Sequence, residues 1–131
     1  MTLVIDASIV LDLMFSGTSL DELTDMEPIG PPLLWTEVTA ILRRSAWRGA
    51  LTDDQASEAL DGFLAGRVTR RSPADLYRES LGLATHLRWA RTYDAEYVAL
   101  ARIERCRLLT SDRRLKREAG HLVEIIGPTE L

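Results

Sequence analysis

The chain has little of several residue types on which other protein functions depend. Its 131 residues include one cysteine, Cys106, and two histidines, His86 and His121. A single cysteine cannot form an internal disulfide, so we expect a reducing environment such as the cytoplasm. No Cys/His spacing suggests a zinc site. A metal-free ribonuclease usually needs two histidines as acid and base; here one falls on the polar flank of an expected helix and the other in a turn, which disfavours that mechanism.

Long apolar runs are also absent. No run approaches the ~18 residues that a membrane span needs, so we expect none. The first residues lack the basic region of a secretory signal and lead directly into an apolar segment. The apolar share of 46% and the charged share of 27% are those of an ordinary globular protein. The length predicts one domain, residues 1–131, around one core.

Basic residues are missing from the first third of the chain. Residues 1–42 hold seven acids and no Lys or Arg, whereas residues 43–131 hold thirteen acids and sixteen bases. Fifteen of those bases are arginine. The arginines could form a solvated helical surface. Alternatively, they flank an acidic mouth and bind phosphates, for which guanidinium is well suited.

The apolar pattern predicts a small sheet surrounded by helices. Residues 3–5 form an apolar run that stops at Asp6, as expected of a buried strand. We expect further strands at residues 107–110 and 122–126, a brief one at 68–69, a polar segment at 20–26 and a loop at 27–32. Helical patterns cover residues 8–15, 33–47, 53–66, 73–89, 94–105 and 112–116. This order predicts an α/β domain with a small, mainly parallel sheet and helices on both faces.

Four acids stand at positions that suggest a shared site. Asp6 and Asp112 each follow an expected strand, so both lie at the carboxyl edge of the sheet, where open α/β folds bind ligands. Glu37 lies on the core-facing stripe of its helix, where a carboxylate is costly unless it is paired or bound to a cation. Asp94 precedes apolar residues at helical spacing. Taken singly, each Asp could merely cap a helix, and Glu37 could extend past the helix edge into solvent.

Taken together, the four acids favour a metal centre. Carboxylates a few Å apart raise one another's pKa values, and a divalent cation removes this conflict. Oxygen-only ligands suit Mg²⁺ or Mn²⁺. Such centres hydrolyse phosphodiester bonds.

Four segments resemble the PIN-domain endoribonucleases, and specifically the VapC-type toxins of bacterial toxin–antitoxin pairs. They are VIDAS (residues 4–8), PLLWTEV (32–38), TYDAEYVALA (92–101) and LTSDRRL (109–115). Each segment alone is a weak signal, but their order and spacing cover nearly the whole chain. The resemblance implies a three-layer PIN-like fold.

The resemblance also implies an activity. A VapC-type toxin is a Mg²⁺- or Mn²⁺-dependent endoribonuclease that cleaves tRNA or rRNA loops and arrests translation. Such toxins commonly form homodimers and are silenced by an antitoxin protein whose tail covers the site. The matching positions here are the catalytic and metal-binding acids Asp6, Glu37, Asp94 and Asp112, supported by the hydroxyls of Ser8 and Thr110.

Other interpretations remain open. Arg113, Arg114 and Lys116 begin a helix beside Asp112 and could contact the RNA backbone, or they could form a solvated face. A catalytically silent protein-binding module could keep the same fold. A phosphoacceptor signalling domain would also have an acidic pocket, but it needs a lysine late in the chain, and Lys116 lies inside a basic helix.

Overall fold

The computed structural model describes residues 1–131 and contains one five-stranded sheet. The strands are β1 (Thr2–Ile5), β2 (Glu27–Gly30), β3 (Thr69–Arg70), β4 (Arg107–Leu109) and β5 (Ile125–Ile126). Every neighbouring pair is parallel, and the order across the sheet is β3-β2-β1-β4-β5. The predicted α/β class with a parallel sheet is confirmed.

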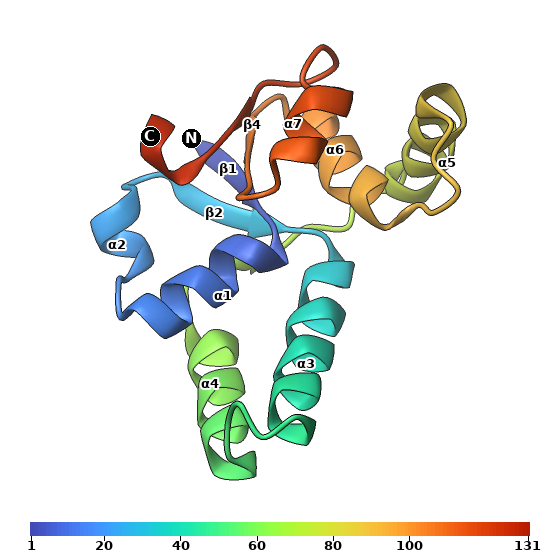
Figure 1. The fold of residues 1–131 in the computed structure, drawn as a ribbon. Helices are drawn as coiled ribbons and strands as arrows, with labels where there is room; N and C mark the ends of the chain where they lie inside the picture. The colour runs from blue at the N-terminus through green and yellow to red at the C-terminus, as the bar shows by residue number, and fades with distance from the viewer.

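Seven α-helices and one short 3₁₀ helix surround this sheet. They are α1 (Ala7–Ser16), α2 (Leu20–Leu23), α3 (Pro32–Trp47), α4 (Asp53–Ala65), α5 (Leu76–Leu87), α6 (Tyr93–Glu104), α7 (Arg113–Ala119) and η1 (Pro128–Glu130). Figure 1 shows α1, α3 and α4 on one side of the sheet and α5, α6 and α7 on the other. This three-layer arrangement follows from right-handed crossovers that leave the central strand in opposite directions. No helix has the length and apolar character needed to cross a membrane.

The core is built on the central strand. Leu3, Val4 and Ile5 of β1 have no exposed surface, because strands and helices cover this strand on every side. Helix α6 packs on both β1 and β4. Its residues from Ala95 to Ala101 are all buried. The small alanines of this helix allow its backbone to approach the sheet closely.

The loop predicted at residues 27–32 was wrong, because its first four residues form β2. Pro28 and Gly30 are typical of loops, yet Pro28 fits here for a geometric reason. The N–H of Glu27 donates to the Met1 carbonyl at 2.9 Å, on the β1 side. Since successive N–H groups of a strand alternate sides, the position of Pro28 faces the β3 side, and β3 pairs only with Ile29 and Gly30. The missing proline donor therefore costs no ladder hydrogen bond.

Gly30 is required by a close approach. A Cβ atom at this position would lie 2.5 Å from Cδ2 of Leu34, a buried residue in the first turn of α3. Glycine thus lets α3 begin immediately after β2. The last strand is also shorter than predicted, since only Ile125 and Ile126 of the expected 122–126 pair with β4.

Candidate active site at the carboxyl edge of the sheet

The site begins at the centre of the sheet, where the order of the parallel strands reverses on the two sides of β1. Connections from β1 lead to β2 on one side, and β4 pairs with β1 on the other. This is the switch point at which open α/β sheets bind ligands. Asp6 follows β1, and Thr110 and Asp112 follow β4. The sheet therefore places two of the predicted acids on adjacent strand ends.

Two hydroxyl groups hold Asp6 and join the two strand ends. Ser8 Oγ donates to Asp6 Oδ1 at 2.6 Å and accepts from the Ser111 N–H at 3.1 Å. Thr110 Oγ1 donates to Asp6 Oδ2 at 2.5 Å and accepts from the Asp112 N–H at 3.0 Å. A hydroxyl has one proton to donate, and each of these two hydroxyls donates it to Asp6. The orientation of the carboxylate is fixed from both sides.

Asp6 is also the N-cap of α1, as the alternative interpretation predicted. Its Oδ1 accepts from the Ile9 N–H at 3.2 Å. The carboxyl is only 8% exposed, and burial raises its pKa above the ordinary value, with a further increase from the charge of Asp94. The hydrogen bonds from Ser8 and Thr110 oppose this rise but do not cancel it. Capping and a functional role are therefore compatible at this residue.

Glu37 projects from α3 into the same region and is half-buried, as predicted. The hydroxyl of Tyr97, from α6, donates to Glu37 Oε1. Burial raises the pKa of Glu37, and the charges of Asp94 and Asp6 raise it further. The charges of Asp94 and Asp6 thus disfavour the ionisation of Glu37. Glu37 makes no ion pair, and the hydrogen bond from Tyr97 and the charge of Arg44 oppose the rise of its pKa without cancelling it.

Asp94 and Asp112 share one cation, Arg114. The guanidinium Nη2 of Arg114 lies 2.6 Å from Asp94 Oδ2 and 3.4 Å from Asp112 Oδ2. Asp112 is the N-cap of α7, since its Oδ1 accepts from the N–H groups of Arg114 and Leu115 at 2.9 and 3.3 Å. Asp94 is not a cap; Thr92 occupies that position of α6. The side chain of Asp94 is therefore free to interact with Arg114.

The predicted basic candidates differ in their surroundings. Arg114 is engaged with acids, including Glu118 at 2.8 Å. Lys116 pairs with Glu130 at 2.8 Å. Arg113 makes no ion pair and lines a hollow together with Ser111 and Asp112. Contact of these three residues with the RNA backbone stays a prediction.

Known proteins with similar sequences come from mycobacteria. Ribonuclease VapC9 of Mycobacterium tuberculosis and a VapC ribonuclease of Mycobacterium bovis are each 32% identical over 114 residues, which is 86% of this chain and 87% of the relative. The chain belongs to the VapC ribonuclease family. No protein-family model matches it.

Solved structures agree with this VapC fold. A Pyrobaculum aerophilum protein superimposes with a TM-score of 0.77 at 21% identity, over 99% of this chain and 94% of that one. The VapBC2 structure from Rickettsia felis, bound to a promoter DNA fragment, gives 0.72 at 15% identity over 97% and 98%. The predicted PIN-like architecture and VapC resemblance are confirmed.

The candidate site fits a hard divalent ion by its donor chemistry. All four predicted ligands are carboxylates, the donors that such an ion prefers. Burial, and to a lesser extent the charges of neighbouring acids, raises the pKa values of two of them, Asp6 and Glu37. In the present arrangement, however, no three His, Cys, Asp or Glu side chains are grouped closely enough to hold an ion. Arg114 provides the positive charge between Asp94 and Asp112. The sequence prediction of four gathered carboxylates is thus met only in part by this geometry.

Two residues that adjoin the candidate site went unrecognised in the sequence. Tyr97 counted only as an apolar position, although a buried tyrosine hydroxyl needs a partner, and here that partner is Glu37. Glu96 is 9% exposed, and burial together with the charge of Glu37 raises its pKa. A glutamate inside an otherwise apolar run was the signal for it. Both residues extend the site along α6.

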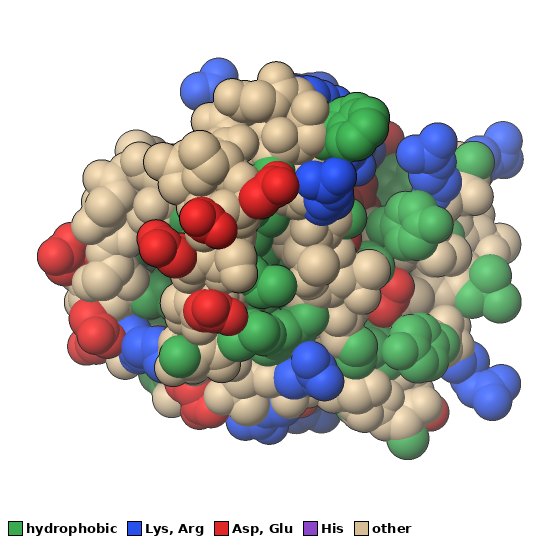
Figure 2. All heavy atoms as spheres, turned by 90° about the horizontal axis from the view of Figure 1, so that it is seen from below, with side chains coloured by type: hydrophobic (Ala, Val, Ile, Leu, Met, Phe, Trp, Pro, Cys, Tyr) green, Lys and Arg blue, Asp and Glu red, His purple; other side chains and the backbone are tan.

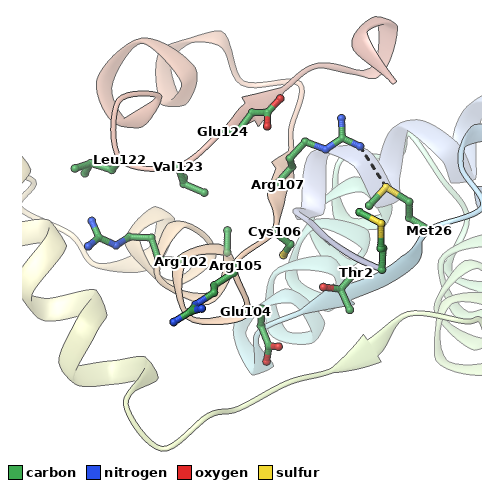
Figure 3. A pocket seen from close by; sticks show the side chains of 12 residues that line it. Thr2, Met26, Arg102, Glu104, Arg105, Cys106, Arg107, Leu122, Val123 and Glu124 are labelled. Atoms are coloured by element: carbon green, nitrogen blue, oxygen red, sulfur yellow. Dashed lines mark hydrogen bonds between the residues drawn. The ribbon is translucent and has the colours of Figure 1, made fainter.

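The largest hollow of the protein lies elsewhere. Figure 3 shows this cavity of about 700 Å³ at the amino edge of the sheet, between Thr2, Arg105, Arg107 and Glu124. Cys106 lies in it, and burial raises the pKa of its thiol, so the thiolate is disfavoured. Arg107 donates to the Met26 sulfur at 3.2 Å. This hollow has no group of mutually repelling acids, and we do not assign the chemistry to it.

Proposed function

We propose that this chain is a Mg²⁺- or Mn²⁺-dependent endoribonuclease that hydrolyses phosphodiester bonds in structured RNA, such as tRNA or rRNA loops. The observation that carries the proposal is the pair of poorly compensated carboxyls, Asp6 and Glu37, facing Asp94 at the switch point of a VapC-family sheet. Neither makes an ion pair, and both have raised pKa values. Carboxylates in this state favour a cation.

Asp6, Asp94 and Asp112 would hold the ion directly, with Glu37 acting through water. A divalent ion supplies Lewis-acid chemistry for phosphodiester hydrolysis. The remaining roles belong to the chain itself. Ser8 and Thr110 keep Asp6 in one orientation through their hydrogen bonds. Tyr97 orients Glu37, whose raised pKa makes it a stronger base toward an attacking water molecule.

We further propose that the protein acts as the toxin of a toxin–antitoxin pair, inhibits translation, and works in the cytoplasm as a homodimer. Structures with the same fold include VapBC-1 from Haemophilus influenzae and a toxin–antitoxin complex from Klebsiella pneumoniae. The charge distribution suits an antitoxin with a basic tail. Residues 1–42 contain no base, and Figure 2 shows acidic side chains concentrated on the side of α2, with Lys and Arg more frequent on the side of α5.

The direct test compares the wild type with Asp94→Asn on tRNA and rRNA. We expect the wild type to cleave in Mg²⁺ or Mn²⁺ and to stop in EDTA. Asp94→Asn should cleave at least about 100-fold more slowly while its circular dichroism stays unchanged. Cleavage that survives EDTA, or full activity of Asp94→Asn, would refute the proposal.

A further inference from the structure

A short loop between α5 and α6 borders the candidate active site. Residues 88–92 connect the two helices, and the first four of them, 88–91, line a hollow of about 490 Å³. The same hollow is lined by Glu37, Asp94 and Arg114. A ligand in it would therefore lie directly beside two of the proposed catalytic acids.

The two arginines of this loop have no protein partner. Arg88 and Arg91 are exposed, and neither guanidinium makes an ion pair or a hydrogen bond within the chain. Arg114, in the same hollow, contacts three carboxylates. The difference matters because a paired guanidinium must break its contacts to bind a new anion. Arg88 and Arg91 can bind a phosphate without such a cost.

The backbone conformation of Arg88 is a second observation that points to a functional role for this residue. Arg88 ends α5 in the left-handed region, with φ 58° and ψ 39°. Helices often place glycine in this conformation, because a Cβ atom there lies too close to the following carbonyl oxygen. Only Arg105 among the other non-glycine residues has a positive φ. The strain at Arg88 lies next to the proposed site, where strained residues are commonly functional.

The loop is anchored while its charged groups stay exposed. The Trp89 N–H donates to the Ala84 carbonyl at 2.8 Å, and Trp89 Nε1 donates to Glu118 Oε1 at 3.2 Å. Glu118 in turn pairs with Arg114. Tyr93, at the start of α6, is 54% exposed and also lines the hollow. The hollow thus combines free guanidinium groups with an exposed aromatic ring on a fixed loop.

We propose that Arg88 and Arg91 form a phosphate-binding subsite for single-stranded RNA, with Tyr93 stacking on a base. Positively charged grooves with aromatic platforms are the common means of binding single strands. The inference rests on the proposed ribonuclease function and adds to it the residues that hold the strand beside the acids. They differ from Arg113, Arg114 and Lys116, of which the last two are already engaged with carboxylates.

The test measures binding apart from cleavage. A fluorescein-labelled 12-nucleotide single-stranded RNA is titrated with protein in EDTA at several salt concentrations, and its anisotropy gives Kd. We expect the double variant Arg88→Gly with Arg91→Gln to bind about tenfold more weakly, and to lose about 1.4 from the slope of log K against log salt, since each single-strand phosphate contact contributes about 0.7.

Arg105→Gly is the matched control for the Arg88→Gly half of the double variant. Arg105 ends α6 with φ 54° and ψ 50°, makes no ion pair, and lies in the amino-edge hollow of Figure 3, at the far end of the helix that begins beside Asp94. The charge loss and the backbone change are the same as in Arg88→Gly. Both glycine variants should keep or raise Tm, because glycine relieves the left-handed strain. We expect Arg105→Gly to change Kd less than twofold.

The outcomes separate the subsite from the ribonuclease proposal. An unchanged Kd and salt slope in the double variant, equal weakening by Arg105→Gly, or no RNA binding by the wild type would overturn the subsite. If the wild type cleaves RNA and the double variant binds as tightly, only the subsite fails. If the predicted Kd and slope changes appear but the wild type never cleaves, the subsite stands and the ribonuclease proposal fails.

Discussion

The two edges of the parallel sheet differ in whether their buried or half-buried acids have a cation partner. At the carboxyl edge, Asp6 and Glu37 lie near Asp94 without an ion pair, and both have raised pKa values. Near the amino edge, Glu104 lies 3.9 Å from Arg71, which also lies 3.6 Å from Glu27. Uncompensated charge costs stability, so its concentration at one edge points to function there.

The sizes of the hollows at the two edges do not distinguish the candidate site. The amino-edge hollow, about 700 Å³, is larger than the hollow of about 490 Å³ beside the acids. Figure 3 shows mixed Arg, Glu, Met and Cys side chains around the larger one, drawn from several elements. The comparison teaches that the electrostatics of the lining residues, rather than the volume, distinguish the candidate site.

The strongest way to break the comparison is to remove one acid at each edge. We expect Asp6→Asn to slow RNA cleavage by about 10²–10⁴-fold, because it removes a proposed metal-binding and catalytic group. Glu104→Gln, at the amino edge, should leave the rate within twofold. Initial rates on the same RNA in Mn²⁺ give both values, and equal rates for the two variants would remove the distinction between the edges.

The hydroxyl of Thr110 provides a sharper test of how the carboxyl edge is held. Thr110→Val removes the hydroxyl partner of Asp6 Oδ2 and of the Asp112 N–H, while Asp6 Oδ1 keeps its bonds from Ser8 and Ile9. We therefore expect a loss of about 1–3 kcal/mol in the free energy of unfolding and slower cleavage. Thr110→Ser keeps the hydroxyl and should restore most of the activity. Urea unfolding and cleavage rates measure the two effects. If valine is as active as serine, the hydrogen bonds to Asp6 do not position it for catalysis.

Glu37→Gln should give the smallest effect, a change in stability. It tests how much stability the protein loses by burying the charge of Glu37. Burial raises the pKa of Glu37 above its ordinary value of 4.5, so the folded state binds its proton more tightly than the unfolded chain does. Stability therefore falls as pH rises from about 4.5 through the raised pKa. Glutamine removes this penalty and can still accept from Tyr97.

We expect metal-free Glu37→Gln to unfold at a higher temperature than the wild type at pH 7.5, with the difference shrinking toward pH 4.5. Thermal unfolding of both proteins in EDTA at a series of pH values measures this difference in Tm. A wild type that is more stable than the variant at pH 7.5 would contradict the sign of the pKa shift.

The sequence predicted the framework of the site better than its contacts. The apolar run before Asp6 and the helix-capping position of Asp6 are local signals, and both appear in the structure. Strand β2 was missed because Pro28 is acceptable only when the neighbouring strand leaves its side unpaired. Arg114 was a candidate for the RNA backbone or for a solvated face, and its contact with Asp94, twenty residues away in the chain, was not foreseen. That contact depends on how α6 and α7 pack, which no local pattern records.

Manganese binding tests the central claim most directly. Isothermal titration calorimetry of the RNA-free protein with MnCl₂ should detect uptake by the wild type and by Glu104→Gln, and at least about tenfold weaker uptake by Asp94→Asn. This result would mean that the acids of the carboxyl edge form one cation site. Equal manganese binding by Asp94→Asn and the wild type, or no binding by the wild type, would contradict it.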